Sequence, residues 1–403
     1  MLIQKTLTGA QNNMKAVQVG VIGIGNIGFA HASCIFQNKI PGMELVAVCD
    51  CDALRKAEAE IHLPGVPFYA DYRDLLNNAQ VDAVIVAVPH PMHGQIAIDA
   101  FEAGKHVLVE KPMEITASRA RQLCEAAGKS GRQFGIMFNQ RTGELFQKAR
   151  ELVRSGKLGD LERTVWIVTN WYRTQHYYDS GAWRATWTGE GGGVLMNQAP
   201  HQLDLWQWIC GMPESVTAFC DTAKFHRIEV EDDATIFARF PGGATGVFIT
   251  STGEYPGTNR LEITGTKGKL VLEDNTLKWW ELETDAHTVS KQSEKSFERI
   301  PMTYQELRPE GGSTGHAAIL QNFANSILYG EELLAPGCDG LHEVLLQNAA
   351  YLSAWTGESI TLPFDEARYD ALLEQHRKTS SAASQATSKK ANTDYHERWQ
   401  INW

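Results

Sequence analysis

The sequence predicts two domains, an N-terminal doubly wound parallel sheet of the α/β class and a C-terminal α+β domain with an open, mostly antiparallel sheet. Short apolar runs alternate with helical segments up to about residue 140, and beyond about residue 158 such runs follow one another with Gly-containing turns. A chain of 403 residues suffices for two or three domains at roughly 150 residues each. We expect an N-terminal extension, a nucleotide-binding domain, a substrate and oligomerisation domain, and a final helix, flexible linker and aromatic tail, over residues 1–14, 15–140, 141–365 and 366–403.

The strands of the first domain are expected where β-branched and apolar residues run without alternation. Such runs are typical of strands that helices cover on both faces. They occupy residues 18–23, 44–50, 81–89, 105–111 and 134–139. Helix-forming stretches that end in Gly or Pro lie between them, as at 53–61 and 94–104.

The second domain is expected to contain a succession of strands and two late helices. The strands are predicted at 161–172, 215–221, 234–240, 243–252, 259–265 and 268–274, and the helices at 316–330 and 340–355. These helices should pack back on both sheets. The Ser-, Ala- and Lys-rich stretch 378–392 reads as a linker, followed by an aromatic end that either docks on a subunit or stays disordered.

Composition excludes several classes of partner and of site. The 37 Lys and Arg residues against 48 Asp and Glu residues give a net charge of −11 without a basic block, which excludes nucleic acid and an anionic membrane as expected partners. Seven scattered cysteines fit neither a disulfide framework nor a metal site, so we expect a reducing compartment and no metal. No stretch resembles a secretory signal or a membrane span, and we expect a cytoplasmic protein.

A glycine motif marks the expected nucleotide site. Gly23, Gly25 and Gly28 form GxGxxG between the first strand and a helix that opens with Asn26 and Ile27. In that context the glycines allow a turn, a close approach of a pyrophosphate and tight helix packing, with the helix N-terminus facing the phosphates.

The position of Asp50 favours NAD. It lies 22 residues after Gly28, at the end of the second strand, where a carboxylate can bind both ribose hydroxyls and would repel a 2′-phosphate. The alternative is a turn or helix-capping role, which Asp52 could fill equally well. Arg55 keeps NADP as the second cofactor candidate.

Residues 15–365 resemble the glucose–fructose oxidoreductase and inositol dehydrogenase (Gfo/Idh/MocA) family. The resemblance depends on the glycine motif, the Val-Pro turn with its histidines at 88–93, EKP at 110–112, FNQR at 138–141, SGKLGD at 155–160, Trp183-Arg184, and GGG at 191–193 followed by His201 and Asp204. It implies a Rossmann-type first domain, a second domain whose open sheet forms oligomer contacts, and nicotinamide-dependent oxidation of sugars or polyols.

The resemblance also implies catalytic roles. Lys111 matches the lysine that contacts the reacting hydroxyl, His201 the catalytic histidine, and Asp204 the acid three residues beyond it. Asn197 stands where inositol dehydrogenases carry Asp, so the proton path is open at that point. On one helix, residues 197, 201 and 204 would share a face and look into one cleft, unless Pro200 starts or bends the helix.

Other expected site residues surround these. Pro89, His93 and Glu110 end two parallel strands, where such sheets bind ligands, and we expect them to contact the cofactor. Rings and arginines between residues 166 and 187 suit a sugar or glycoside, although half of the rings should fill the core. The expected substrate contacts are Arg141, Tyr172, Trp183, Arg184, Asn197 and Asp204.

We therefore expect an NAD-dependent dehydrogenase that oxidises a secondary ring hydroxyl of a sugar, glycoside or polyol to a ketone, with C3 as one candidate. His201 would act as general base and Lys111 would stabilise the alkoxide while hydride leaves for NAD. One alternative is a redox-neutral NAD-dependent glycosidase or lyase that oxidises its substrate transiently. Another is a non-catalytic dinucleotide-binding regulator. We expect a homo-oligomer formed through the second sheet.

Overall fold

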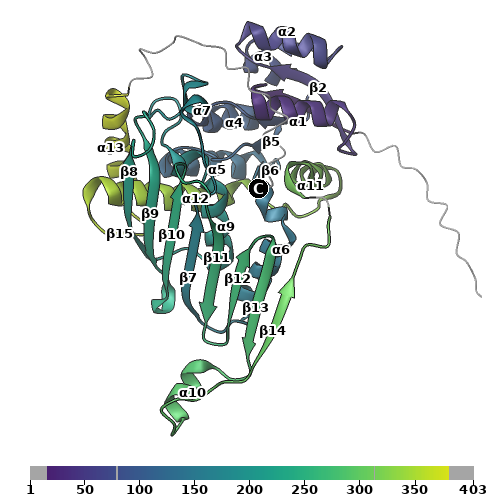
Figure 1. Cartoon of the computed structure of the whole chain (residues 1–403). Helices are drawn as coiled ribbons and strands as arrows, with labels where there is room; N and C mark the ends of the chain where they lie inside the picture. The colour runs from purple at the N-terminus through teal and green to yellow at the C-terminus, as the bar shows by residue number, and fades with distance from the viewer. Residues whose placement is uncertain (1–15, 79, 313, 381–403) are drawn as a thin grey trace, which may run out of the picture.

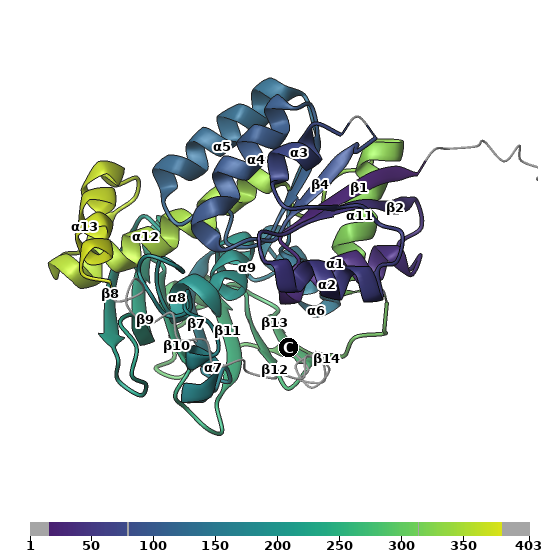
Figure 2. The ribbon, with the colours of Figure 1, turned by 90° about the horizontal axis from the view of Figure 1, so that it is seen from above.

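A computed structural model describes residues 16–78, 80–312 and 314–380 of the chain. It contains two sheets, each with its own hydrophobic core, and Figures 1 and 2 show helices packed between and around them. The expected N-terminal extension, nearly all of the linker and the aromatic tail lie outside the described residues.

The first sheet is parallel, as predicted. Its six strands have the order β3-β2-β1-β4-β5-β6, which is that of a doubly wound nucleotide-binding fold. The strands are β1 Val17–Ile22, β2 Met43–Cys49, β3 Phe68–Tyr69, β4 Ala83–Val86, β5 His106–Val109 and β6 Phe134–Ile136. The strand β3 was not predicted, because two residues are too few to show a pattern.

Helices cover both faces of this sheet. Figure 2 shows α3, α4 and α5 on one face and α1, α2 and α11 on the other. Their bounds are α1 Asn26–Phe36, α2 Ala53–His62, α3 Tyr72–Leu76, α4 His93–Glu102, α5 Ala117–Ser130 and α11 Gly315–Tyr329.

The helix α11 belongs to the first core although it comes late in the chain. Ile319, Leu320 and Phe323 are buried among the strands and helices of the first sheet. The predicted helix at 316–330 is confirmed, and it completes the face of the sheet that the first 140 residues leave uncovered. The domain boundary at residue 141 stays a prediction. It applies to the main part of the first domain only, because α11 lies beyond it in the chain but packs in the first core.

The second sheet is mixed and mostly antiparallel, as predicted. Its nine strands have the order β14-β13-β12-β11-β7-β10-β9-β8-β15, and β7 with β10 is its parallel pair. The strands are β7 Leu161–Val168, β8 Ser215–Thr222, β9 Glu231–Arg239, β10 Thr245–Ser251, β11 Asn259–Gly265, β12 Gly268–Glu273, β13 Thr276–Leu282, β14 Met302–Leu307 and β15 Ile360–Thr361. The last three were not predicted, and β14 is an exposed edge strand without a buried face.

One face of the second sheet is covered by helices and the other is left open (Figure 2). The elements of this domain are α6 Glu144–Arg154, α7 Gln175–Asp179, α8 Val194–Asn197, α9 Pro200–Cys210, α10 Ala286–Gln292, α12 Gly340–Thr356 and α13 Glu366–Lys378. The predicted helix at 340–355 is thus confirmed as α12.

Of the arrangements left open for residues 197–204, the structure has the one in which a helix starts at Pro200, so no single helix carries residues 197, 201 and 204. The helix α8 ends at Asn197, and Pro200 is the first residue of α9. Proline fits this position because its missing N–H would have no partner in the first helical turn, whereas inside a helix its ring would collide with the preceding turn. Asn197 and His201 therefore lie at facing ends of two short helices.

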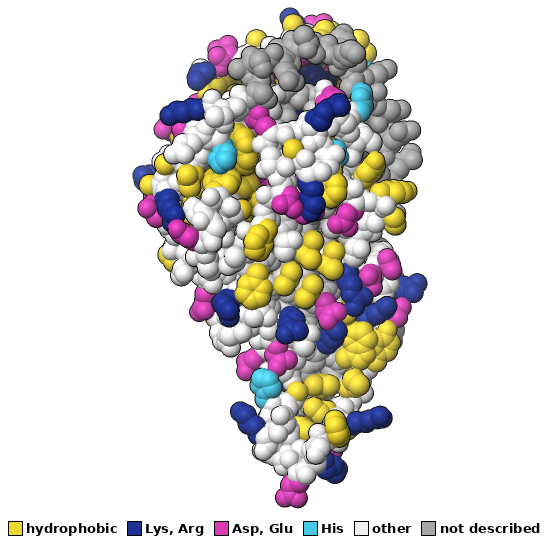
Figure 3. All heavy atoms as spheres, turned by 60° about the vertical axis from the view of Figure 1, so that its left-hand side comes forward, with side chains coloured by type: hydrophobic (Ala, Val, Ile, Leu, Met, Phe, Trp, Pro, Cys, Tyr) yellow, Lys and Arg dark blue, Asp and Glu magenta, His cyan; other side chains and the backbone are white. Residues whose placement is uncertain are grey.

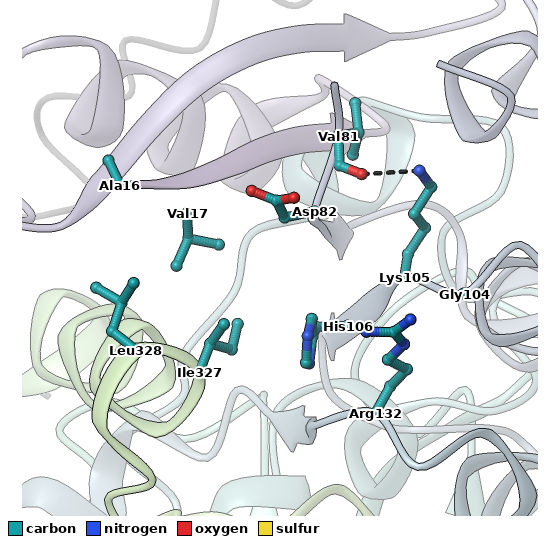
Figure 4. Close-up of a pocket in the computed structure, with 10 residues that line it drawn as sticks. All are labelled: Ala16, Val17, Val81, Asp82, Gly104, Lys105, His106, Arg132, Ile327 and Leu328. Carbon is teal, nitrogen blue, oxygen red and sulfur yellow. Dashed lines mark hydrogen bonds between the residues drawn. The ribbon is translucent and has the colours of Figure 1, made fainter. Parts of the chain in front are cut away.

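A small cavity of about 360 Å³ lies at the amino ends of β1, β4 and β5 (Figure 4). The Lys105 ammonium there donates to the carbonyl oxygens of Val81, at 2.7 Å, and Asn78, at 3.1 Å. This lysine therefore links the loop before β5 to the loop before β4, at the edge of the sheet that is opposite to the glycine motif.

Candidate active site

A cavity of about 810 Å³ lies at the carboxyl ends of the first sheet and is lined by both domains. In open α/β sheets, ligands bind at this edge, where the strand order reverses. The first domain contributes its predicted cofactor residues Gly23, Gly25, Asn26, Ile27, Asp50, Pro89, His93, Glu110 and Lys111. The second domain contributes Trp171, Arg173, Trp183, Arg184, Asn197, Gln198 and His201, and α11 adds His316.

The three glycines have distinct surroundings. Gly23 has φ +84°, and a Cβ there would lie 2.6 Å from the carbonyl oxygen of Ala87. A Cβ on Gly28 would lie 1.8 Å from the Gly23 oxygen, so Gly28 permits packing and is not on the cavity wall. A Cβ on Gly25, which precedes α1, would meet nothing within 4 Å. The loop therefore offers open backbone and a helix N-terminus to an anionic ligand.

The carboxylate of Asp50 is held beside this loop. One oxygen accepts from the backbone N–H of Ile24, at 2.9 Å, and the other from that of Asp52, at 2.9 Å. Asp52 itself caps α2 by accepting from the Leu54 amide, so the capping role belongs to Asp52. The glycine cradle and Asp50 together fit the pyrophosphate and ribose of NAD. Arg55 lines the same end of the cavity.

His93 and Glu110 are both fixed on the cavity wall. The ring nitrogens of His93 lie 2.8 Å from the Pro112 oxygen and 2.7 Å from the Val88 oxygen, so the ring is held between two loops. Burial lowers the pKa of His93. Burial raises the pKa of Glu110, but the hydrogen bond and charge of His31, at 2.7 Å, outweigh burial and hold that pKa at about 2.

Lys111 reaches across the cavity from the first domain to the second. Its ammonium donates to the main-chain oxygen of Asn197, at 2.7 Å. The peptide bond between Lys111 and Pro112 is cis. The lysine head group is part-buried and lies on the wall that also carries His201.

His201 lies in the first turn of α9 and faces the same cavity. Its Nδ1 atom is buried and has no hydrogen-bond partner among the described residues, and its ring packs edge-on against Phe138. Burial and the charges of Lys111 and His316 lower its pKa well below the ordinary value of 6.5. The ring is therefore neutral at pH 7 and is able to accept a proton.

A buried carboxylate that the sequence analysis did not predict lies beside Asn197. The Asn197 side-chain nitrogen donates to Oε1 of Glu190 and, at 3.3 Å, to the Tyr177 hydroxyl. Glu190 is 2% exposed, and its Oε2 accepts from the Ala185 amide at 2.5 Å. Burial raises the pKa of Glu190 to about 7.

The Gly191–Gly193 run is closely packed and is not a flexible loop. A Cβ on Gly193 would lie 1.8 Å from the Glu231 main-chain oxygen, and one on Gly192 would lie 2.2 Å from the Tyr351 hydroxyl. The buried Glu231 carboxylate accepts from the amides of Gly193, at 3.0 Å, and Leu195, at 2.9 Å. The run therefore lets α8 approach β9 and places Asn197.

Three of the expected substrate contacts do not lie on the cavity wall. Arg141 and Asp204 form a two-pronged ion pair with distances of 2.8 and 2.6 Å, and their side chains are each 1% exposed. Asp204 therefore lies inside the protein and does not share a cleft with Asn197 and His201. Tyr172 is 46% exposed and its ring packs against Tyr255. Trp183, Arg184 and Asn197 do line the cavity.

The aromatic segment divides between wall and core, as expected. Trp166, Tyr178 and Trp187 are buried in the second core, and Trp183 lines the cavity. Trp171 belongs to that core, being 5% exposed, and also borders the cavity. Arg184 donates to the Tyr177 hydroxyl at 2.8 Å, and its guanidinium lies over the Trp183 ring.

His316 is the site residue that sequence reasoning missed most clearly. It enters the cavity from α11, and its Nδ1 lies 3.4 Å from the Asn139 side-chain nitrogen. Burial lowers the pKa of His316 to about 4. Its segment reads as a packing helix, and no local motif marks the histidine.

Across the described ranges, no helix is long and apolar enough to cross a bilayer. Among the same residues, no group of three His, Cys, Asp or Glu side chains is placed to hold a metal ion.

Comparison with protein families gives two adjacent matches. Residues 17–138 match the model of an oxidoreductase family with an NAD-binding Rossmann fold, and residues 146–271 match the GFO/IDH/MocA C-terminal domain.

Individual proteins show the same similarity. The chain is 26% identical over 352 residues to myo-inositol 2-dehydrogenase of Thermotoga maritima, covering 86% of this chain and 98% of that one. The crystal structure of the WlbA dehydrogenase of Chromobacterium violaceum in complex with NADH and UDP-GlcNAcA superposes with a TM-score of 0.75 at 28% identity, covering 91% of this chain and 100% of that one. A shorter match, 30% over 194 residues, joins 45% of this chain to 42% of an alpha-N-acetylgalactosaminidase of Shewanella oneidensis.

Proposed function

Because the chain belongs to the GFO/IDH/MocA family of NAD-binding oxidoreductases, we propose that it oxidises a secondary ring hydroxyl of a sugar, glycoside or polyol to a ketone. C3 is one candidate position. The observation that carries the proposal is that one cavity contains the glycine loop with Asp50 at one end and Lys111 with His201 at the other. A sensor of the dinucleotide needs neither of the last two groups.

Three residues on the cavity wall have separate roles in the proposed oxidation. The neutral His201 ring takes the proton of the reacting hydroxyl as general base. The Lys111 ammonium donates to the same oxygen and stabilises the developing alkoxide. NAD⁺, when bound, accepts the carbon-bound hydrogen as hydride. Asn197 offers its side-chain amide to a neighbouring substrate hydroxyl.

The second-domain wall suits a sugar. The rings of Trp171 and Trp183 can stack on the apolar face of a pyranose, and Arg173 and Arg184 can donate to hydroxyl or acid groups. The bound UDP-GlcNAcA of the WlbA structure, a sugar nucleotide, is in keeping with such a wall.

The test follows absorbance at 340 nm with NAD⁺ and a panel of glucose, inositol isomers, methyl glucosides and p-nitrophenyl glycosides. Formation of NADH with one panel member supports the dehydrogenase. Bound nucleotide is first measured in the purified protein, because a tightly held cofactor would mask net reduction. Tight NAD binding without any product from the panel would indicate the non-catalytic regulator instead.

The partial similarity to the galactosaminidase supports a second candidate, a redox-neutral glycosidase. Transient oxidation to the ketone would acidify a neighbouring C–H bond, and loss of that proton would expel the aglycone. Water would then add in place of the aglycone, the carbon would regain a proton, and return of the hydride would reduce the ketone. Release of p-nitrophenol from an aryl glycoside without net NADH would favour this activity over the dehydrogenase.

We further propose that the open face of the second sheet joins two copies of this chain. Val247 of β10 is paired with Val165 of β7 and with Phe237 of β9, and all three are half-buried on the face that the helices leave uncovered. Ile249 and Ile167 extend this apolar patch. Figure 3 shows groups of exposed hydrophobic side chains on the lower part of the molecule, where this sheet lies. Light scattering of V247E should show a smaller assembly than the wild type.

A further inference from the structure

We propose that Glu190 is a positioning residue for this reaction, because it orients the side-chain amide of Asn197 so that the oxygen Oδ1 faces the substrate. The amide would then accept a hydrogen bond from a substrate hydroxyl. The inference rests on the proposed function, since it assigns a role within the same site.

The geometry leaves one favourable orientation of the amide. The Asn197 nitrogen points at two oxygen atoms, Oε1 of Glu190 and the hydroxyl of Tyr177. When Glu190 is ionised, above its pKa of about 7, a rotation by 180° would place Oδ1 against the carboxylate, and two acceptors would then face each other. Since an amide carries its donors and its acceptor on opposite sides, Oδ1 is directed away from Glu190. Asn197 lines the cavity, and our proposal places a substrate hydroxyl within reach of Oδ1.

Glu190 is itself held firmly enough to act in this way. It is 2% exposed, Oε2 accepts from the Ala185 amide at 2.5 Å, and its own amide donates to the Thr186 oxygen at 3.0 Å. Its main-chain oxygen lies 3.1 Å from Nδ1 of His90, which also lines the cavity. The Ala185 amide thus holds the carboxylate, while the contacts with Thr186 and His90 hold the main chain of Glu190.

The same residue, Asn197, also receives Lys111. Its main-chain oxygen accepts from the lysine ammonium at 2.7 Å while its side chain contacts Glu190. Loss of the carboxylate would therefore loosen a residue that contacts both the catalytic lysine and the substrate. The expected consequence is slower turnover with little change in cofactor binding, since the glycine loop and Asp50 lie at the other end of the cavity.

The test exchanges the carboxylate of residue 190 and the amide of residue 197. E190Q removes the charge that orients the amide. N197D places two carboxylates in contact, so one of them must hold a proton. The double variant E190Q/N197D restores one acid and one amide, with their positions reversed. E114Q is the matched control, because Glu114 is equally buried but does not line the cavity.

At pH 8, where Glu190 is mostly ionised, and with the panel compound that the wild type oxidises, E190Q should lower kcat at least tenfold while the NAD dissociation constant stays within threefold. N197D should lose activity as pH rises above neutrality, and the double variant should regain at least half of the wild-type kcat without that alkaline loss. E114Q should keep the wild-type kcat. Wild-type kcat and pH profile in E190Q, or a double variant no better than N197D, would overturn the inference.

Thermal unfolding without substrate gives an independent readout. The two single changes should not be additive in the double variant, because the residues are in contact. Additive losses would overturn the contact on which the inference depends. If the wild type oxidises no panel compound, the proposed function fails, whereas non-additive unfolding would still support the pairing of Glu190 with Asn197.

Discussion

The ammonium of Lys111 and the main-chain oxygen of Asn197 are 2.7 Å apart and join the two domains across the candidate active site. The lysine follows β5 of the first sheet, and the oxygen ends α8 of the second domain. Under the proposed function, a substrate hydroxyl that displaces or shares this contact would lie beside His201. The bond would then keep the ammonium at the place where negative charge develops.

Replacement of this lysine should abolish most of the turnover. K111A removes the donor to the alkoxide, and we expect a loss in kcat of about 10²–10³-fold. The dissociation constant of NAD should change by no more than a few-fold, as measured by fluorescence titration. K129A, which removes an exposed lysine, should behave as the wild type. Near-normal turnover in K111A would show that the lysine does not contact the reacting oxygen.

His201 should act as a base over an unusually wide pH range. Because burial and neighbouring charges lower its pKa well below 6.5, the neutral ring persists in acid. In E190Q, where residue 190 no longer titrates, we expect kcat/KM to stay constant between pH 8 and pH 6.5 and to decline only below that. H201A should lose about 10²–10⁴-fold in kcat at pH 7.5. If H201A kept nearly all of its turnover while binding NAD normally, the assignment would be wrong.

The fold could be predicted where the burial of residues gives the sequence a recognisable hydrophobic pattern. The strand that ends before Gly23 and the helix that begins at Asn26 are recognisable because one is apolar on both faces and the glycines separate them. The edge strand β14 is exposed along almost its whole length, so no burial pattern exists to be read. Pro200 indicated in the sequence that a helix starts or bends there. That α8 and α9 are two separate helices depends on how the Gly191–Gly193 run packs.

The cofactor half of the site was predictable because its residues follow one another along a motif. The substrate half was not, since its contacts join distant segments. Asp204 resembles a site residue in the sequence. In the structure Arg141, 63 positions earlier, neutralises the charge of its carboxylate. Glu190 and His316 carry no local signal, and only the tertiary structure brings them to Asn197 and to the cavity.

Asp50 should set the preference for NAD. D50N removes the charge that would bind the ribose hydroxyls and repel a 2′-phosphate, while Arg55 remains at the same end of the cavity. Loss of hydrogen bonds to a charged group should raise the NAD dissociation constant about 10–100-fold. NADP should bind more tightly than to the wild type. Calorimetric titration with both nucleotides measures the change, and an unchanged NAD/NADP ratio would contradict it. D52N serves as the neighbouring control.

Glu231 should make the folded protein less stable as pH rises. Burial raises its pKa to about 7, although the Tyr351 hydroxyl and the Leu195 and Gly193 amides oppose this shift. With an ordinary value of 4.5 in the unfolded chain, its contribution is fully present below about pH 4.5 and is lost as pH rises through 7. E231Q cannot ionise, so its melting temperature should decline less steeply between pH 5.5 and 8 than that of the wild type. Parallel melting curves over that range would show that Glu231 stays ionised.

The ion pair of Arg141 and Asp204 should contribute to stability and not to substrate contact. Both side chains are 1% exposed, and Arg141 also donates to Asp339 at 2.6 Å. D204A leaves a buried guanidinium without its main partner, which should cost about 3–5 kcal/mol of unfolding free energy in urea denaturation. E151A, which breaks the exposed pair with Lys148, should leave the midpoint unchanged. D204A protein that is as stable as the wild type but inactive would instead return Asp204 to the active site.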